Sequence, residues 1–152
     1  MPESLRLFLP DEAATAALAA RVAARARAGD AVLLEGPLGA GKSAFARAFL
    51  RAASGDAGLE VPSPTFTLVQ EYAWPGGRAF HFDLWRLDGP AGLAELGWED
   101  AREGVVIVEW PDRLGALRPS DALELALEPG ATDQARIATL SGWPGRLPEL
   151  NA

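Results

Sequence analysis

The sequence predicts an α/β protein of three layers, in which helices flank a mixed, partly antiparallel central sheet. The apolar segment 31–35, which is typical of a buried strand, is followed by a glycine-rich turn and by an amphipathic helix from Ser43 onward. This order is that of a strand-turn-helix unit in a parallel sheet. Two strand-like segments on either side of the turn 74–77 (WPGG) predict an antiparallel hairpin. Together the two patterns indicate a sheet with both kinds of pairing.

The first third of the chain contains clear helix signals. Residues 4–9 alternate as a strand does, and Pro10 and Asp11 end that strand. Asp11 is a good N-cap for a helix over residues 12–28, which has arginines toward its end and Gly29 just past it. In the second predicted helix, apolar residues from Phe45 to Ala53 fall on one side.

The remaining elements follow from shorter patterns. Residues 53–64 predict a loop, residues 65–73 and 78–87 the two arms of the hairpin, and residues 88–95 a short helix. The most apolar run, 105–108 (VVIV), predicts a central strand that ends at Glu109. Two late strands are expected at 122–127 and 134–140. The tail after about residue 142 has no pattern, and we expect it to be poorly ordered.

Length and composition favour one compact domain over residues 1–152. Apolar residues make up 49% of the chain and charged residues 23%, which is enough material for a core and argues against disorder. The longest uncharged run, Val61 to Gln70, contains two prolines and is far shorter than the roughly 20 apolar residues of a membrane-spanning helix. A transmembrane protein is therefore not expected.

Charge and cysteine content restrict the functional classes. The chain has no cysteine, and its N-terminus lacks an export signal, so we expect a cytoplasmic protein without disulfides or thiolate metal sites. The formal net charge of -7 works against bulk attraction to nucleic-acid phosphates. Any anionic ligand must be held by a local site.

Residues 36–43 (GPLGAGKS) match the phosphate-loop pattern G-x-x-x-x-G-K-[ST] in its required place between a strand and a helix. This context predicts a P-loop NTPase-like fold. Gly36, Gly39 and Gly41 permit backbone conformations that bring main-chain amides close to phosphate oxygens. Lys42, the only lysine in the chain, is placed to reach the outer phosphates, and the Ser43 hydroxyl to bind Mg²⁺. The predicted ligand is a nucleoside triphosphate with magnesium.

Carboxylates at strand ends beside such a loop are candidates for magnesium binding and hydrolysis. Glu109 follows the apolar run and Asp83 follows a strand-like segment, but spacing does not decide which holds the metal and which orients the attacking water. His81 is predicted to be a sheet histidine rather than a catalyst. Thr65, in the hydroxyl-rich segment SPTFT, fits a phosphate-sensing switch or simple turn chemistry equally well. Trp110 fits partner contact and core capping equally well.

Five segments in order, LPDEAAT, GPLGAGKS, SPTFTLV, HFDLWRL and VEWP, closely resemble the bacterial TsaE (YjeE) family, the ATPase of tRNA threonylcarbamoyladenosine biosynthesis. The resemblance implies binding of ATP or ADP with Mg²⁺, and slow hydrolysis in support of the TsaD and TsaB proteins, which modify the adenosine next to the anticodon. It implies activity roles for Asp83 and Trp110, and a magnesium site that includes Ser43 and Glu109. It also implies that Glu12 approaches the nucleotide and that phosphates are cradled by Gly39, Ala40, Gly41, Lys42, Ser43 and Ala44.

Two positions depart from the family pattern: Ser43 replaces the commoner Thr, and Trp85 stands where Tyr is usual. Neither change removes the hydroxyl or aromatic character. The acidic charge suits a protein that docks on partner proteins without gripping tRNA itself. Two alternatives are a small-molecule or nucleoside kinase, and a nucleotide-gated binding module with negligible turnover. A GTPase is disfavoured, because the Asn-Lys-x-Asp element needs a second lysine.

Overall fold

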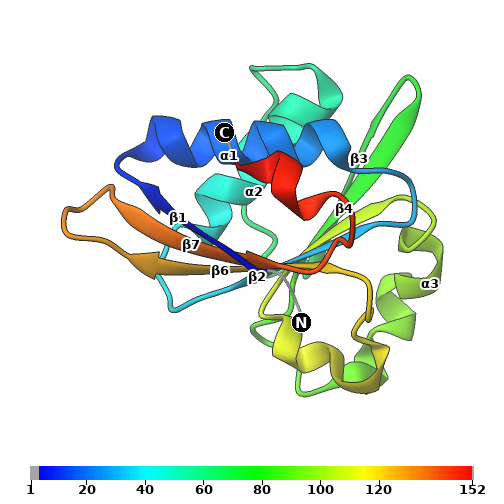
Figure 1. The fold of residues 1–152 in the computed structure, drawn as a ribbon. Helices are drawn as coiled ribbons and strands as arrows, with labels where there is room; N and C mark the ends of the chain where they lie inside the picture. The colour runs from blue at the N-terminus through cyan, green and yellow to red at the C-terminus, as the bar shows by residue number, and fades with distance from the viewer. Residues whose placement is uncertain (1–3, 152) are drawn as a thin grey trace.

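The computed structural model describes residues 4–151 and forms a seven-stranded sheet in the order β1-β7-β6-β2-β5-β4-β3 (Figure 1). The strands are β1 (Ser4–Leu9), β2 (Ala31–Glu35), β3 (Val69–Trp74), β4 (Gly77–Asp83), β5 (Val105–Glu109), β6 (Leu123–Pro129) and β7 (Arg136–Ser141). The α-helices are α1 (Glu12–Arg25), α2 (Lys42–Ser54) and α3 (Trp98–Ala101). The 3-10 helices are η1 (Pro90–Gly92), η2 (Ala94–Leu96), η3 (Pro111–Leu117) and η4 (Leu147–Leu150).

The sheet is mixed, as the sequence predicts. Strands β6, β2, β5 and β4 run parallel to one another, whereas β1, β7 and β3 pair antiparallel with their neighbours. Since parallel strands end at the same edge of a sheet, the loop after β2, the acids ending β4 and β5, and the turn after β6 lie along one edge. This edge carries the candidate site.

Helices cover both faces and make the three layers (Figure 1). On one face, α1, α2 and η4 pack over a cluster that includes Leu18, Phe45 and Phe49. On the other face, α3 and the short segments around it pack over a second cluster that includes Phe82 and Trp98. The alternating side chains of the strands thus supply two cores, one for each face. No helix among residues 4–151 is long and apolar enough to cross a membrane.

The first helix begins as predicted and ends earlier than predicted. Asp11 is extended and its Oδ1 accepts a hydrogen bond from the Ala14 amide at 2.9 Å, which confirms the N-cap. The helix stops at Arg25, because Ala26 is extended and the Arg25 carbonyl accepts a hydrogen bond from Arg146 Nη1 at 2.8 Å. An arginine distant in sequence therefore occupies the carbonyl that a further helical turn would use.

The hairpin strands are shorter than predicted. Residues 65–68 form a turn and not the start of β3, and Leu68 has a left-handed φ of 70°. β4 ends at Asp83, because its neighbour β5 ends at the paired residue Glu109. Beyond Asp83 the Leu84 amide still donates to the Glu109 carbonyl at 3.1 Å, and residues 85–86 form a turn. The predicted helix over 88–95 consists of two 3-10 turns, and the sequence pattern missed α3.

The C-terminal tail differs from the sequence expectation of poor order. Trp143, Leu147 and Leu150 are buried against the α1 face of the sheet, and residues 147–150 form η4. Arg146 forms an ion pair with Asp30 at 2.7 Å, and its guanidinium lies 4.2 Å from the Trp143 ring centroid. The tail therefore completes one of the two cores, and it has no periodic pattern because its contacts come from isolated residues.

Candidate functional site

The glycine-rich loop connects β2 to α2, in the place that the sequence predicts. Gly36, Gly39 and Gly41 all have positive φ, at 144°, 83° and 99°. Two features exclude a side chain at Gly36. Its positive φ is unfavourable for other residues, and a Cβ added there would collide with the carbonyl oxygen of Leu127 in β6. The loop can therefore lie against β6 only if this residue is glycine.

Lys42 is the first residue of α2, and its buried side chain folds back onto the backbone of the loop. Its Nζ donates a hydrogen bond to the Gly36 carbonyl at 2.6 Å and lies 3.5 Å from the centroid of the Trp110 ring. Burial lowers the pKa of Lys42, and the nearby charges of Glu109 and Asp83 act in the opposite direction. An ammonium held in this way is ready to exchange a carbonyl for a phosphate oxygen.

Ser43 and Glu109 lie together although 66 residues separate them. The Ser43 hydroxyl donates to Glu109 Oε1 at 3.4 Å, and Glu109 Oε2 lies 2.6 Å from His81 Nε2. β5 pairs with both β2 and β4, so Glu109 at the end of β5 lies beside the end of β2 and close to the start of α2. Hydroxyl and carboxylate oxygens are the donors that Mg²⁺ prefers, so this pair fits a magnesium site.

Residues 4–151 contain no group of three or more His, Cys, Asp or Glu side chains that would hold a metal by itself. Magnesium commonly takes one or two protein ligands, with phosphate oxygens and water filling its other positions. The Ser43–Glu109 pair therefore fits a metal that arrives with a nucleotide.

Asp83 connects the same edge to the segment 63–67. Its Oδ2 accepts from the Thr65 hydroxyl at 3.2 Å, and its Oδ1 accepts from the Trp85 amide at 3.1 Å. Thr65 Oγ1 in turn lies 2.7 Å from Ser63 Oγ. This chain of hydrogen bonds ties a surface loop to a buried carboxylate that is paired in register with Glu109.

Trp110 follows Glu109 in a conformation that is unusual for a large residue. Its φ and ψ are 60° and 53°, in the left-handed region that costs non-glycine residues free energy. Besides covering Lys42, its ring packs on the half-exposed Trp85 with centroids 4.5 Å apart. The strained backbone thus places the Trp110 ring between Lys42 and Trp85.

One pocket of about 350 Å³ unites most of the predicted site residues. The predicted residues that line it are Gly39, Gly41, Lys42, Ser43, Ala44, Thr65, Asp83, Glu109 and Trp110. Gly36 and Ala40 do not line it, although both belong to the loop. Glu12 lies instead in a neighbouring groove of about 380 Å³ between α1 and α2, which shares Ala44 with the pocket.

Arg136 also lines this pocket, although no sequence motif identifies it. It begins β7, and its Nη2 donates to the Gly39 carbonyl at 3.4 Å while Nη1 donates to the carbonyls of Asp133 and Ala135. No ion pair to Arg136 occurs within residues 4–151. The pocket therefore contains a second cation. Its only sequence signal was its position near the start of the predicted strand over residues 134–140.

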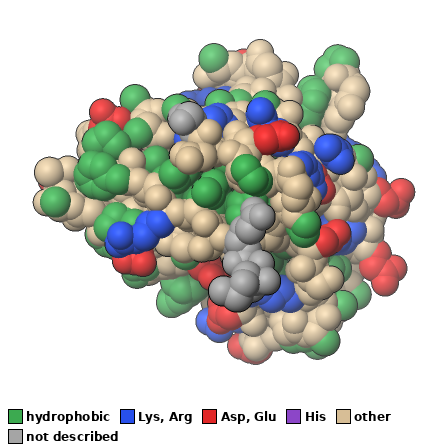
Figure 2. All heavy atoms as spheres, viewed as in Figure 1, with side chains coloured by type: hydrophobic (Ala, Val, Ile, Leu, Met, Phe, Trp, Pro, Cys, Tyr) green, Lys and Arg blue, Asp and Glu red, His purple; other side chains and the backbone are tan. Residues whose placement is uncertain are grey.

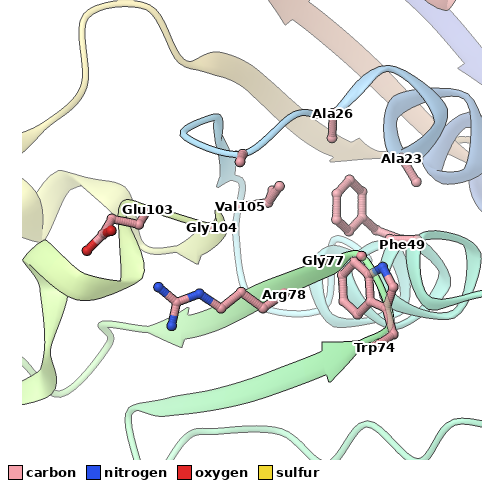
Figure 3. Close-up of a pocket in the computed structure, with 12 residues that line it drawn as sticks. Ala23, Ala26, Phe49, Trp74, Gly77, Arg78, Glu103, Gly104 and Val105 are labelled. Carbon is pink, nitrogen blue, oxygen red and sulfur yellow. The ribbon is translucent and has the colours of Figure 1, made fainter.

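A pocket of about 390 Å³ lies at the opposite end of the sheet, where β4 and β5 begin (Figure 3). Phe49 of α2 and Trp74 of the hairpin contribute aromatic surface to it, and Arg78 stands at its edge. Arg78 already forms ion pairs with Glu71 and Asp100. This pocket lacks the loop amides, the buried lysine and the paired acids. The candidate functional site is therefore the slightly smaller pocket at the glycine-rich loop.

A family model described as "Threonylcarbamoyl adenosine biosynthesis protein TsaE" matches residues 9–137, which include the loop, both acids and Arg136. The chain belongs to the TsaE family. This result confirms the resemblance carried by the five sequence segments.

Curated relatives agree with this assignment, and each is described as a tRNA threonylcarbamoyladenosine biosynthesis protein TsaE. The relative from Rickettsia felis is 37% identical over 123 residues, covering 80% of this chain and 71% of that protein. The relative from Bacillus subtilis is 33% identical over 138 residues, covering 87% and 81%. The relative from Synechocystis is 39% identical over 119 residues, covering 75% and 74%.

A solved structure supports the fold of this TsaE family member. The crystal structure of YdiB from Bacillus subtilis superposes with a TM-score of 0.75 and 29% sequence identity, covering 99% of this chain and 93% of that chain. The predicted P-loop-like α/β fold is thereby confirmed.

Proposed function

We propose that the chain is a magnesium-dependent ATPase that supports threonylcarbamoyladenosine modification of tRNA together with TsaD and TsaB. The observation that carries the proposal is the convergence of Lys42, Ser43 and Glu109 in one pocket at the start of α2. Family membership supplies the pathway, and the pocket supplies the chemistry that a nucleotide needs. The resemblance to an ATPase family supports ATP or ADP as the ligand.

The loop residues bind the phosphates. Amides of the glycine-rich loop and the first turn of α2, residues 39–44, present hydrogen-bond donors at the positive end of a helix. Lys42 exchanges its hydrogen bond to the Gly36 carbonyl for the outer phosphates. Ser43 and Glu109 hold magnesium, which when bound neutralises charge on the β- and γ-phosphates.

The structure supports different roles for the two acids, which the sequence left open. Glu109 lies beside the Ser43 hydroxyl and so belongs to the magnesium site. Asp83 bonds to Thr65 and to a backbone amide, and each of its oxygens can accept a further bond. We assign Asp83 to orienting the attacking water and to holding the segment 63–67 in a phosphate-dependent position.

Partner docking is expected around the nucleotide pocket. Three of the exposed large apolar side chains, Leu38, Phe66 and Trp85, belong to segments that line or contact the pocket. Exposed apolar groups gathered in this way are typical of a protein interface. On the face shown in Figure 2 the basic side chains are scattered and form no continuous stripe, which supports docking on proteins rather than direct gripping of tRNA.

The kinase alternative receives little support from the segment after β4. A kinase needs a mobile lid that excludes water from the acceptor. Here the segment between β4 and β5 is packed into the second core through Leu93, Trp98 and Ala101. Such burial opposes the opening and closing that a lid requires.

The test is phosphate release from ATP and Mg²⁺ by the purified chain, alone and with TsaD and TsaB. We expect slow release alone, an increase with the partners, and loss of activity in Lys42→Ala and Glu109→Gln. Glu103→Gln makes the same chemical change at an exposed residue at the other end of the sheet and should behave as wild type. Lack of stimulation combined with phosphorylation of a metabolite would favour a kinase. Lack of adenine-nucleotide binding by calorimetry would end the proposal.

A further inference from the structure

We infer that His81 is a positioning residue for Glu109: its Nε2–H holds one carboxylate oxygen and thereby turns the other toward Ser43 and the bound magnesium. The inference rests on the proposed function, and it assigns a task to a residue that the sequence analysis treated as part of the sheet. The residue does not line the nucleotide pocket.

The contact is short and closed to water. His81 Nε2 and Glu109 Oε2 are 2.6 Å apart, and the side chains are 1% and 4% exposed. The other oxygen, Oε1, is the one that accepts from the Ser43 hydroxyl. Each oxygen of Glu109 therefore has a separate partner, and of the two partners only Ser43 lines the pocket.

Strand pairing makes this arrangement rigid. β4 and β5 pair in parallel, with His81 opposite Ile107 and Asp83 opposite Glu109. The side chains of His81 and Asp83 share one face of β4, because they are two residues apart. Since neither partner stands on a loop, the imidazole holds the carboxylate in one orientation before any ligand binds.

Hydrogen bonding assigns the proton to Nε2. An ionised carboxylate only accepts, so Nε2 must be the donor in this contact. Nδ1 is buried and has no partner within residues 4–151. A bare nitrogen lone pair is tolerated there better than an unpaired N–H would be, which supports a ring whose hydrogen is on Nε2.

This role matters because the affinity of a carboxylate for a metal depends on how the carboxylate is oriented. Partners behind metal-ligating carboxylates orient them, and their loss typically lowers metal affinity or activity 10- to 100-fold. Without the Nε2–H donor, the carboxylate of Glu109 could rotate away from Ser43. Binding of the phosphates through the loop amides and Lys42 does not depend on this orientation.

The test compares the affinity of the full chain for ADP in Mg²⁺ and in EDTA, by calorimetry. For His81→Leu we expect the gain in affinity that Mg²⁺ provides to fall about 10- to 100-fold, with the affinity in EDTA unchanged. His81→Gln keeps an N–H donor near the same place and should restore most of the gain. Phe82→Leu, at a buried neighbour on the opposite face of β4, should lower stability and leave the gain unchanged.

A second measurement uses the fact that His81 is the only histidine in the chain. With ¹⁵N-labelled histidine, NMR of the wild-type protein should show a single imidazole with its hydrogen on Nε2, and the ring signals should shift when Mg²⁺ and ADP are added. A hydrogen on Nδ1 instead would overturn the inference, because Nε2 would then have nothing to donate.

The outcomes separate this inference from the function on which it rests. If wild type gains affinity from Mg²⁺ and His81→Leu keeps that gain, His81 has no positioning role and the proposed function is untouched. Equal losses in Mg²⁺ and in EDTA would also overturn the inference, because they would show a general defect of the pocket. If wild type gains nothing from Mg²⁺, the proposed magnesium site fails, and the role of His81 fails with it.

Discussion

Replacing Arg136 by alanine should weaken nucleotide binding more than it weakens the binding of inorganic tripolyphosphate. The reason is the strand order, in which β5 and β4, with Glu109 and Asp83, lie on one side of β2, and β6 and β7 lie on the other. If a triphosphate lies along this edge with its magnesium-binding phosphates at Glu109, its nucleoside points toward β6 and β7. Arg136 lines the pocket on that side.

The magnitude follows from the hydrogen bonds that Arg136 already makes. A guanidinium has five N–H donors. Nη1 makes two bonds at 2.7 Å and Nη2 makes one at 3.4 Å, while the Nε–H is buried and has no partner within residues 4–151. One hydrogen of Nη2 is therefore left for a ligand. A hydrogen bond with a charged partner contributes about 1.5 to 3 kcal/mol. Its loss corresponds to an increase in Kd of about 10- to 150-fold.

Calorimetry with Mg²⁺ measures ADP, ATP and tripolyphosphate on wild type, Arg136→Ala and Arg136→Lys. The lysine variant keeps the charge but lacks the planar donor fork, so we expect an intermediate loss. Arg27→Ala is the charge-matched control, because Arg27 is exposed and lies just before β2, at the far end of the sheet.

Two results would refute the reasoning. Equal losses for nucleotides and tripolyphosphate would show that Arg136 acts on the phosphates or on the glycine-rich loop, through the Gly39 carbonyl, and not on the nucleoside. Unchanged nucleotide affinity would place the nucleoside elsewhere, for example in the groove with Glu12.

Three further predictions concern stability. Because burial lowers the pKa of Lys42 from its ordinary 10.5, the unfolded chain holds this proton more tightly, so the free energy of unfolding should rise with pH just below that value. Urea titrations across this range should show no such rise for Lys42→Met. Trp143→Ala should lower the free energy of unfolding by about 3 to 5 kcal/mol, and the half-exposed Trp85→Ala by about 1 kcal/mol; similar losses would contradict a packed tail. Gly36→Ala should cost at least about 2 kcal/mol more than Gly39→Ala, because only a Cβ at Gly36 meets backbone; equal melting temperatures would count against this.

The sequence predicted correctly those helices and strands whose formation depends on residues within the same segment. The segment from Ala31 to Glu35 is apolar throughout because β2 is buried on both faces, and the Asp11 cap acts within one turn of its helix. The segments that were mispredicted depend on distant partners. β4 stops where β5 stops, and the first helix ends where Arg146 meets it.

In the candidate site, too, some residues could be identified from a local motif, whereas others depend on contacts between distant segments. Lys42 and Ser43 could be named from the loop motif, since the motif itself is contiguous. Glu109 and Asp83 could be named as acids at strand ends, but their separate hydrogen-bond partners appear only after the strands pair. Arg136 escaped notice because no short pattern marks an arginine whose importance lies in reaching another strand's loop.

The sequence alone determined the phosphate-loop motif, the mixed α/β class and the resemblance to TsaE, because each depends on residues close together along the chain. Only the tertiary structure decided that His81 faces Glu109, that Arg136 reaches Gly39, and that the C-terminal tail completes a core. These contacts depend on strand order and register, which are set by the packing of the whole sheet and not by any one segment.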